Sequence, residues 1–210
     1  MPRQRQDTAS PRRRDEVIDA AARVFHEKGY AAASIQDVAD ELGMLKGSVY
    51  HYIDSKQDLL FAIIEDVHRR TMDELEQWVS IEGGALVRLR AFLHGQVLSY
   101  CRNVERVGVF LQDMRSLSED QRVRILDERD RYDRVVRDLI RSGQEEGVID
   151  PEVDPKLAAM AIFGMLNWVS TWWRPDGPST PDEVADEFTD LALSGLARRD
   201  IPRSGIGCPT

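Results

Sequence analysis

The stretch GMLKGSVYHYIDSK, residues 43–56, decides the fold of this chain. Gly43 marks the end of one helix, and a second, short helix is expected from Lys46 to about Tyr52. Val49 and Ile53 lie four residues apart and therefore share the inner face of that helix. The Tyr-His-Tyr run at 50–52 is consecutive, and consecutive helical residues cannot all face one core. At least one of these side chains is expected on the surface, where it can contact another molecule.

Two further helices precede this stretch. Apolar residues at helical spacing predict a helix from Arg12 to Lys28, closed by Gly29 as a left-handed cap. Ser34 with Asp37 has the spacing of a capping box and starts the next helix, which runs to about Leu42. Three short helices with a glycine turn between the last two are typical of a helix-turn-helix.

The remainder of the chain repeats one pattern, a capped amphipathic helix followed by a short break. Helices are expected over about 55–79, 85–102, 105–115, 118–142, 154–173 and 180–196. No alternating strand pattern of useful length is present. The predicted fold class is all-α, with about nine helices: an N-terminal three-helix helix-turn-helix domain and a C-terminal helical domain.

The charge distribution supports two parts with different partners. Residues 1–56 carry nine Lys/Arg and nine Asp/Glu, whereas the rest carries 19 basic and 28 acidic residues and so holds the whole net charge of −9. A neutral head on an acidic body permits a nucleic-acid partner for the head. The expected segments are a disordered basic arm (1–11), the helix-turn-helix domain (12–56), a helical domain (57–197) and a disordered tail (198–210).

Several functional classes lack their sequence signals. Cys101 and Cys208 have no metal-ligand spacing, and no metal or other cofactor is expected. The serines lack a G-x-S-x-G setting and no glycine-rich phosphate loop is present, so an enzyme is not expected. No secretory leader or membrane-spanning run is found, which predicts a cytoplasmic protein without a membrane partner. A protein–protein adaptor stays as an alternative; it would show no salt-dependent affinity for DNA.

Three motifs resemble the DNA-binding domain of the TetR family of bacterial regulators: DVADELG at 37–43, SVYHYI at 48–53 and SKQDLL at 55–60. The resemblance is close over about residues 12–62 and rests on helix number and length beyond them. It implies a ligand-responsive transcriptional repressor that binds a palindromic double-stranded operator as a homodimer and leaves it when a small hydrophobic effector binds. It also implies that the helix-turn-helix over 12–56 is the DNA-binding domain and that residues 57–197 form the effector-binding and dimerisation domain.

The short helix expected from Lys46 to about Tyr52 is the recognition helix, the one that enters the major groove of DNA. Its side chains offer hydrogen-bond donors for both bases and phosphates. Lys46 can donate to guanine, and Ser48 can bond to a base or a phosphate. Tyr50, His51 and Lys56 are suited to phosphate contacts that fix the register. The resemblance adds Ser34 and Gln36, which would touch a phosphate and a base edge. The full set of expected DNA-binding residues is Ser34, Gln36, Leu45, Lys46, Gly47, Ser48, Tyr50, His51, Tyr52 and Lys56.

The last two helices are expected to form the dimer. The resemblance implies a four-helix bundle, and stripes of small and large apolar residues suit it, although a monomer core could use the same stripes. The expected interface residues are Ala161, Gly164, Trp168, Trp172, Phe188, Leu191 and Gly195.

The middle helices combine aromatic walls with isolated polar groups, as small-molecule pockets do. The expected lining is Phe92, Gln96, Tyr100, Phe110, Met114, Tyr132 and Asn167. The resemblance implies that an effector bound there moves the helix that begins near Gln57.

Two segments, 44–61 and 164–177, resemble regulators of fatty-acid, sterol or aromatic-acid degradation, many of which respond to acyl-CoA thioesters. An acyl-CoA effector is therefore one hypothesis. The alternative is a regulator of efflux or detoxification genes that senses a hydrophobic compound without CoA.

Overall fold

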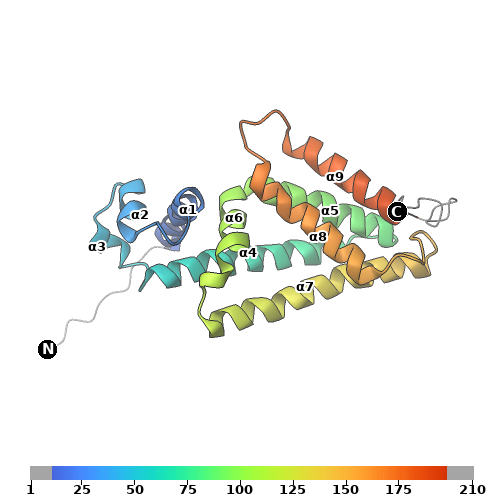
Figure 1. The fold of residues 1–210 in the computed structure, drawn as a ribbon, viewed down its shortest axis with the longest axis horizontal. Coiled ribbons are helices and arrows are strands. Elements are labelled where there is room, and N and C mark those ends of the chain that lie inside the picture. Colours follow the sequence, from blue (N-terminus) through green and yellow to red (C-terminus); the bar gives the residue numbers. More distant parts are fainter. Residues whose placement is uncertain (1–10, 198–210) are drawn as a thin grey trace, which may run out of the picture. The chain divides into compact units, whose positions relative to one another are not determined.

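The computed structural model describes residues 11–197, which form nine α-helices and one 3₁₀ turn (Figure 1). The predicted all-α fold is confirmed. Residues 1–10 of the predicted arm (1–11) and the predicted tail (198–210) lie outside the described residues, and residue 11 is the first of α1. Within 11–197 the only β-type pairing is an isolated bridge between Ile149 and Ala197. Across the same residues, no helix combines the length and apolar character that crossing a bilayer requires.

The chain divides into two compact units. Unit 1 contains α1 (Pro11–Lys28), α2 (Ile35–Glu41), α3 (Lys46–Val49), the part of α4 (Lys56–Val79) up to Arg70, α6 (Val104–Asp113), the 3₁₀ turn Met114–Ser116 and the start of α7 (Glu119–Glu145). Unit 2 contains the end of α4, α5 (Ala85–Arg102), the rest of α7, α8 (Pro155–Trp172) and α9 (Pro181–Leu196).

The core of unit 1 explains its composition. Val17, Phe25 and Val38 from α1 and α2 are buried together with Val49 of α3 and Leu59 of α4. The same cluster includes three residues distant in sequence, Val109, Leu117 and Ile125. Residues 103–127 therefore fold with the head. The predicted functional boundary after Lys56 stays a prediction, because grouping by packing does not say where the DNA-binding function ends.

In unit 2, helix α5 packs against both α8 and α9, and α8 also contacts α9 (Figure 1). Two polar pairs one helical turn apart join α5 to α9: Arg90 pairs with Asp190 at 2.7 Å, and His94 Nε2 lies 3.3 Å from an Asp186 oxygen. The predicted N-terminal signals of α8 and α9 are confirmed. Asp154 accepts from the backbone N–H groups at 156 and 157, and Thr180 with Glu183 forms a capping box.

The predicted end of α7 near Ser142 is wrong, because the helix runs on to Glu145. Gly143 does not break the helix; it is buried, and a side chain there would meet the Ile149 side chain at 2.5 Å. The reversal comes at Gly147, whose φ of +73° is a left-handed conformation that costs glycine little. Gly143 is thus a packing residue and Gly147 the stop signal.

The start of α5 is held by a carboxylate from the end of α7. Both Glu146 oxygens accept from the Ala85 backbone N–H, at 3.0 and 2.9 Å. The first turn of a helix has N–H groups without an internal partner and a partial positive charge, so a carboxylate there stabilises the helix.

Replacing Glu146 with Ala removes this cap, and we expect a loss of about 1 kcal/mol in the free energy of unfolding. For a chain of this size the melting temperature should fall by about 2–4 °C. Differential scanning calorimetry measures it. Glu145→Ala, which removes a neighbouring exposed carboxylate, is the control; equal shifts in both variants would contradict the capping role.

Candidate functional site

The start of α2 is fixed by side chains before the recognition segment begins. Ser34 and Asp37 form the predicted capping box: the Ser34 backbone N–H donates to Asp37 Oδ2 at 2.8 Å, and the Asp37 N–H donates to Ser34 Oγ at 3.2 Å. Lys28, at the end of α1, pairs with the other Asp37 oxygen at 2.6 Å. These contacts, Lys28 first, hold the pKa of Asp37 well below its usual range. The carboxylate therefore stays charged and ties α1 to α2.

Gly43 makes the turn between α2 and α3. Its φ of +63° confirms the predicted break, and the next residue, Met44, donates its N–H to Ala39 O at 2.8 Å. Such a conformation is strained for residues that carry a Cβ atom. The turn brings α3 against α2 within a few residues.

Helix α3 is shorter than predicted, since it ends at Val49 and not near Tyr52. The residues that follow make tight bonds to the third residue before them: His51 N to Ser48 O at 3.2 Å, and Tyr52 N to Val49 O at 2.9 Å. These are turn bonds of the 3₁₀ type, which commonly close the end of a helix. Tyr50, His51 and Tyr52 lie in this turn.

The two faces of the α3 segment separate as predicted. Val49 and Ile53 are buried in the unit 1 core with Val38 and Phe25, and Leu42 packs against them. Lys46, Gly47, Tyr50 and His51 are exposed and Ser48 is half-buried. Leu45, just before α3, is 80% exposed, an unusual position for a large apolar side chain. This surface presents donors and an apolar group together, which are the features that read DNA base edges.

Tyr52 differs from its neighbours, because its ring is half-buried against the unit 1 core. Its hydroxyl interacts with the guanidinium of Arg13 in the first turns of α1. Arg13, whose raised pKa is due mainly to Glu16, was not among the predicted site residues. The basic run Arg12–Arg14 was the available signal, but the contact with Tyr52 needs the folded chain.

Lys56 has partners inside the protein. Its ammonium group donates to the Tyr30 carbonyl and lies 4.3 Å from the centre of the Tyr30 ring. A lysine has three N–H donors, so two remain for other acceptors. The phosphate contact predicted for Lys56 stays a prediction, and the structure adds a role in holding the loop after α1.

Ser34 and Gln36 are exposed at the start of α2. The Gln36 amide nitrogen donates to Asp40 Oδ1 at 2.7 Å, and its amide oxygen remains available to a donor. The predicted contacts of these two residues with DNA remain untested predictions.

Five of the seven predicted effector residues come together in unit 2. Buried Tyr132 donates its hydroxyl to Gln96 Oε1, and Tyr100 donates to Asn167 Oδ1 at 3.3 Å. Phe92 contacts Tyr132 edge to face, with ring centres 6.0 Å apart. Burial raises the pKa of Tyr100 to about 12 and that of Tyr132 well above 10, so both hydroxyls stay protonated and can donate at neutral pH.

One polar atom of this cluster has no partner. Gln96 is completely buried, and its amide nitrogen makes no hydrogen bond within the described residues. A buried donor without an acceptor costs about 1–3 kcal/mol, so an acceptor supplied by a ligand would be favoured there. Glu74, which was not predicted, acts electrostatically on both tyrosines.

The other two predicted effector residues, Phe110 and Met114, lie in unit 1 and pack against its core. Their residue types suit a pocket and a core equally well, so the sequence could not separate the two roles. They are not brought together with the Gln96 cluster inside one unit.

The predicted dimer residues lie on the two helices α8 and α9. All but Phe188 are exposed, Trp168 at 61% and Leu191 at 67%. Phe188 is half-buried beside the Trp172 ring. Between the helices runs a groove of about 480 Å³, lined in part by Leu157, Ala161 and Gly195. An apolar surface of this kind marks an interaction site.

Residues 11–197 contain no group of three or more His, Cys, Asp or Glu side chains placed to hold a metal ion. Cys101 is buried, and burial raises the pKa of its thiol to about 11. Cys208 lies outside the described residues.

Comparison with known families gives matches over most of the chain. The profile described as bacterial regulatory proteins of the tetR family matches residues 17–63. The profile described as the tetracyclin repressor-like C-terminal domain matches residues 82–196.

Individual relatives agree with these matches. The HTH-type transcriptional repressor KstR2 of Mycobacterium tuberculosis is 28% identical over 202 residues, 90% of this chain and 95% of the repressor. Its ketosteroid-regulator structure has a TM-score of 0.85 at 25% identity, over 89% of this chain and 96% of that one. The regulator PfmR of Thermus thermophilus is 36% identical, with a TM-score of 0.79 over 87% and 99%. AibR, in a complex with isovaleryl coenzyme A and operator DNA, is 27% identical, with a TM-score of 0.76 over 85% and 96%.

Lys46 and Lys56 should affect DNA binding differently. Lys46→Ala removes an exposed donor at the start of α3, so we expect it to change which bases are preferred, with a cost of about 1–3 kcal/mol on the best site. Lys56→Ala should weaken binding about equally on all sequences and lower the salt dependence, as loss of one phosphate contact does. Fluorescence anisotropy on operator and scrambled duplexes at several salt concentrations measures both effects. Wild-type behaviour of both variants would show that these residues do not contact DNA.

Proposed function

The chain belongs to the TetR family of bacterial transcriptional regulators, and from this premise we propose that it represses transcription as a homodimer released from its operator by a hydrophobic effector, an acyl-CoA thioester. The observation that carries DNA binding is the division of the α3 segment, in which Val49 and Ile53 are buried while Lys46, Gly47 and Tyr50 are exposed. A recognition helix needs this division, since one face must pack and the other must enter the major groove. The DNA lies in the bacterial cytoplasm, where we expect the protein to work.

Dimerisation follows from the demands of the operator and from the exposed face of α8 and α9. One short recognition segment reaches few base pairs, and helix-turn-helix proteins usually place two of them about 34–36 Å apart by two-fold symmetry. Trp168, Leu157 and Leu191 are each more than half exposed, which is costly for an isolated chain in water. A second copy of the chain that covers these side chains would remove the cost of their exposure to water. The two-fold symmetry of such a dimer matches a palindromic operator.

The Gln96 cluster supports an effector site inside unit 2. The Phe92 ring contacts the Tyr132 ring, which in turn contacts the Phe163 ring. The buried Gln96 amide nitrogen beside them has no hydrogen-bond partner among residues 11–197. Apolar walls with a few polar groups bind hydrophobic molecules and orient one polar atom. A thioester or carboxyl oxygen is an acceptor that the Gln96 amide can bind.

Among hydrophobic effectors we favour an acyl-CoA. AibR, which resembles this chain over most of its length, was captured with isovaleryl coenzyme A and operator DNA. KstR2 is named a ketosteroid regulator, which agrees with lipid or sterol breakdown as the regulated process. The alternative is a hydrophobic compound without CoA and control of efflux or detoxification genes; aromatic walls alone would serve such a ligand equally well.

A comparison of ligands separates these cases. A ligand at 100 times its Kd stabilises the folded protein by about 2.7 kcal/mol, which raises the melting temperature by about 5–10 °C for a chain of this size. We expect this shift, and release of operator DNA, with an acyl-CoA but not with free fatty acid or CoA alone. Gln96→Leu should weaken the acyl-CoA response about tenfold through loss of one hydrogen bond. If none of the three compounds has an effect, the proposal of an acyl-CoA effector is rejected, while the proposal that the protein binds DNA still stands.

Trp168→Glu should turn the dimer into a monomer, because it places a charge in the apolar face of α8. Sedimentation velocity at micromolar concentration should show the change, together with loss of operator binding. Val87→Glu changes an apolar residue on α5 that is 50% exposed and lies outside this face, and it should leave the dimer intact. A wild-type protein that sediments as a monomer would reject the proposal outright.

A further inference from the structure

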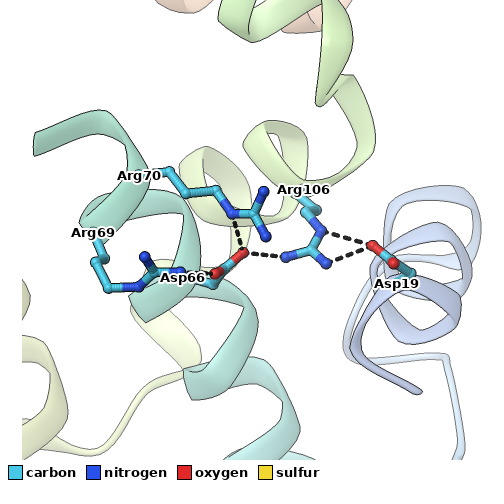
Figure 2. Close-up of polar contacts among 5 residues, drawn as sticks. All are labelled: Asp19, Asp66, Arg69, Arg70 and Arg106. Atoms are coloured by element: carbon cyan, nitrogen blue, oxygen red, sulfur yellow. Dashed lines mark hydrogen bonds and ion pairs between the residues drawn. The ribbon is translucent and has the colours of Figure 1, made fainter. Parts of the chain in front are cut away.

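Helix α6 carries an arginine that contacts two other helices of unit 1 at once (Figure 2). Arg106 donates from Nε, at 3.0 Å, and from Nη2 to Asp19 of α1. Its Nη1 donates to Asp66 of α4. The Arg106 side chain is only 10% exposed. A single guanidinium therefore connects α1, α6 and α4.

Asp66 has two further partners. Arg70 Nε lies 2.8 Å from one of its oxygens, and Arg69 Nη2 lies 2.6 Å from the other (Figure 2). Asp19, in contrast, remains 50% exposed. The two acids are thus held differently: Asp66 is saturated with cations, whereas Asp19 depends on Arg106 and water.

Three other contacts hold α6 against the same parts of unit 1. Gly108 lies so close to α1 that a side chain there would overlap the His26 ring. The Asp113 carboxylate accepts a hydrogen bond from the backbone of Tyr30, in the loop after α1. Phe110 stacks on His68 of α4, with ring centres 6.5 Å apart. Helix α6 therefore lies between α1 and α4, and Arg106 is its charged contact with both.

A buried arginine is an expensive way to join helices. Its desolvation offsets most of the attraction to the acids, so apolar side chains of similar size often stabilise a fold as well or better. The guanidinium contributes geometric specificity, because its N–H groups lie in one plane and can bond to the two carboxylates in only a few relative orientations.

We propose that Arg106 is the positioning residue of the DNA-binding head: through Asp19 and Asp66 it fixes α1 relative to α4, and so sets the orientation in which α2 and α3 meet the operator. The inference rests on the proposed operator binding and adds a residue remote from the DNA contacts. Arg106 stabilises the orientation of α1 relative to α4 that binds the operator. Without Arg106, α1 can adopt other orientations relative to α4.

Arg106→Met should fold, for reasons visible in the cluster. Asp66 keeps Arg69 and Arg70, and the half-exposed Asp19 regains water, so the substitution leaves no isolated buried charge. Methionine occupies a similar volume and fills irregular gaps well. The melting temperature should stay close to that of the wild type.

Operator binding tests the proposal. We expect Arg106→Met to weaken operator affinity about tenfold, while affinity for scrambled DNA stays unchanged because the exposed residues of α3 are untouched. Arg106→Lys keeps the charge but has no planar fork, and should recover only part of the affinity. The control is Arg124→Met, which removes the exposed pair of Arg124 with Glu65 in the same unit; it should bind operator like the wild type.

A double-mutant cycle shows whether the pair itself acts. Asp19→Asn should weaken operator binding, and Asp19→Asn with Arg106→Met should be no weaker than Arg106→Met alone. Additive losses of operator affinity in the double variant would overturn the proposed positioning role of Arg106, as would wild-type operator affinity in Arg106→Met. A fall in melting temperature with operator affinity unchanged would show that Arg106 is only structural. Failure of the wild type to bind any operator would instead reject the proposed function.

Discussion

A four-residue helix cannot hold its own shape in water, because the first turn fixes several residues for one hydrogen bond. Helix α3 therefore depends on the burial of Val49, and of Ile53 just beyond it, against Val38 and Phe25. This packing decides which residues are left outside. Lys46, Gly47 and Tyr50 are exposed because the residues between and after them are committed to the core.

The same packing needs more chain than the three head helices supply. Val109 of α6, Leu117 after the 3₁₀ turn and Ile125 of α7 complete the cluster around α1 and α4. Small cores bury too little apolar surface to be stable alone, and these distant residues enlarge the core. The consequence for a regulator is that α6 belongs, by its packing, to the unit that carries the predicted DNA-binding residues.

Local signals in the sequence predicted much of this fold. Ser34 with Asp37, Asp154 with Pro155 and Thr180 with Glu183 each act over three or four residues, and each is found as expected. The end of α7 was harder to predict, because a packing glycine such as Gly143 and a helix-ending glycine such as Gly147 look alike in sequence. Side-chain roles that depend on distant partners could not be predicted. The carbonyl bound by Lys56 is 26 residues away, and Phe110 suited a pocket as well as a core. Arg106 had a weak signal, one arginine among the valines of VERVGV, whose meaning depends on Asp19, 87 residues earlier.

Two buried polar side chains of this protein, Gln96 and Arg106, differ in whether their donors are satisfied, and the difference suits the two roles proposed for them. Within the part of the chain that the structure describes, the Gln96 amide nitrogen is a donor without an acceptor, so a molecule that supplies an acceptor gains more there than in water. Arg106 is bonded on both sides, yet one partner, Asp19, is half in water and can be rehydrated at low cost. A ligand shifts an equilibrium only by the difference between its affinities for the two states. The contact that differs between the two states must therefore break at a modest cost in free energy. The close packing of an apolar core does not allow this. Along the chain only Asn103 stands between α5, which carries Gln96, and α6, which carries Arg106. The proposed effector would thus bind to one helix, and the proposed positioning residue lies on the next, held by an ion pair that can separate while the apolar core stays intact.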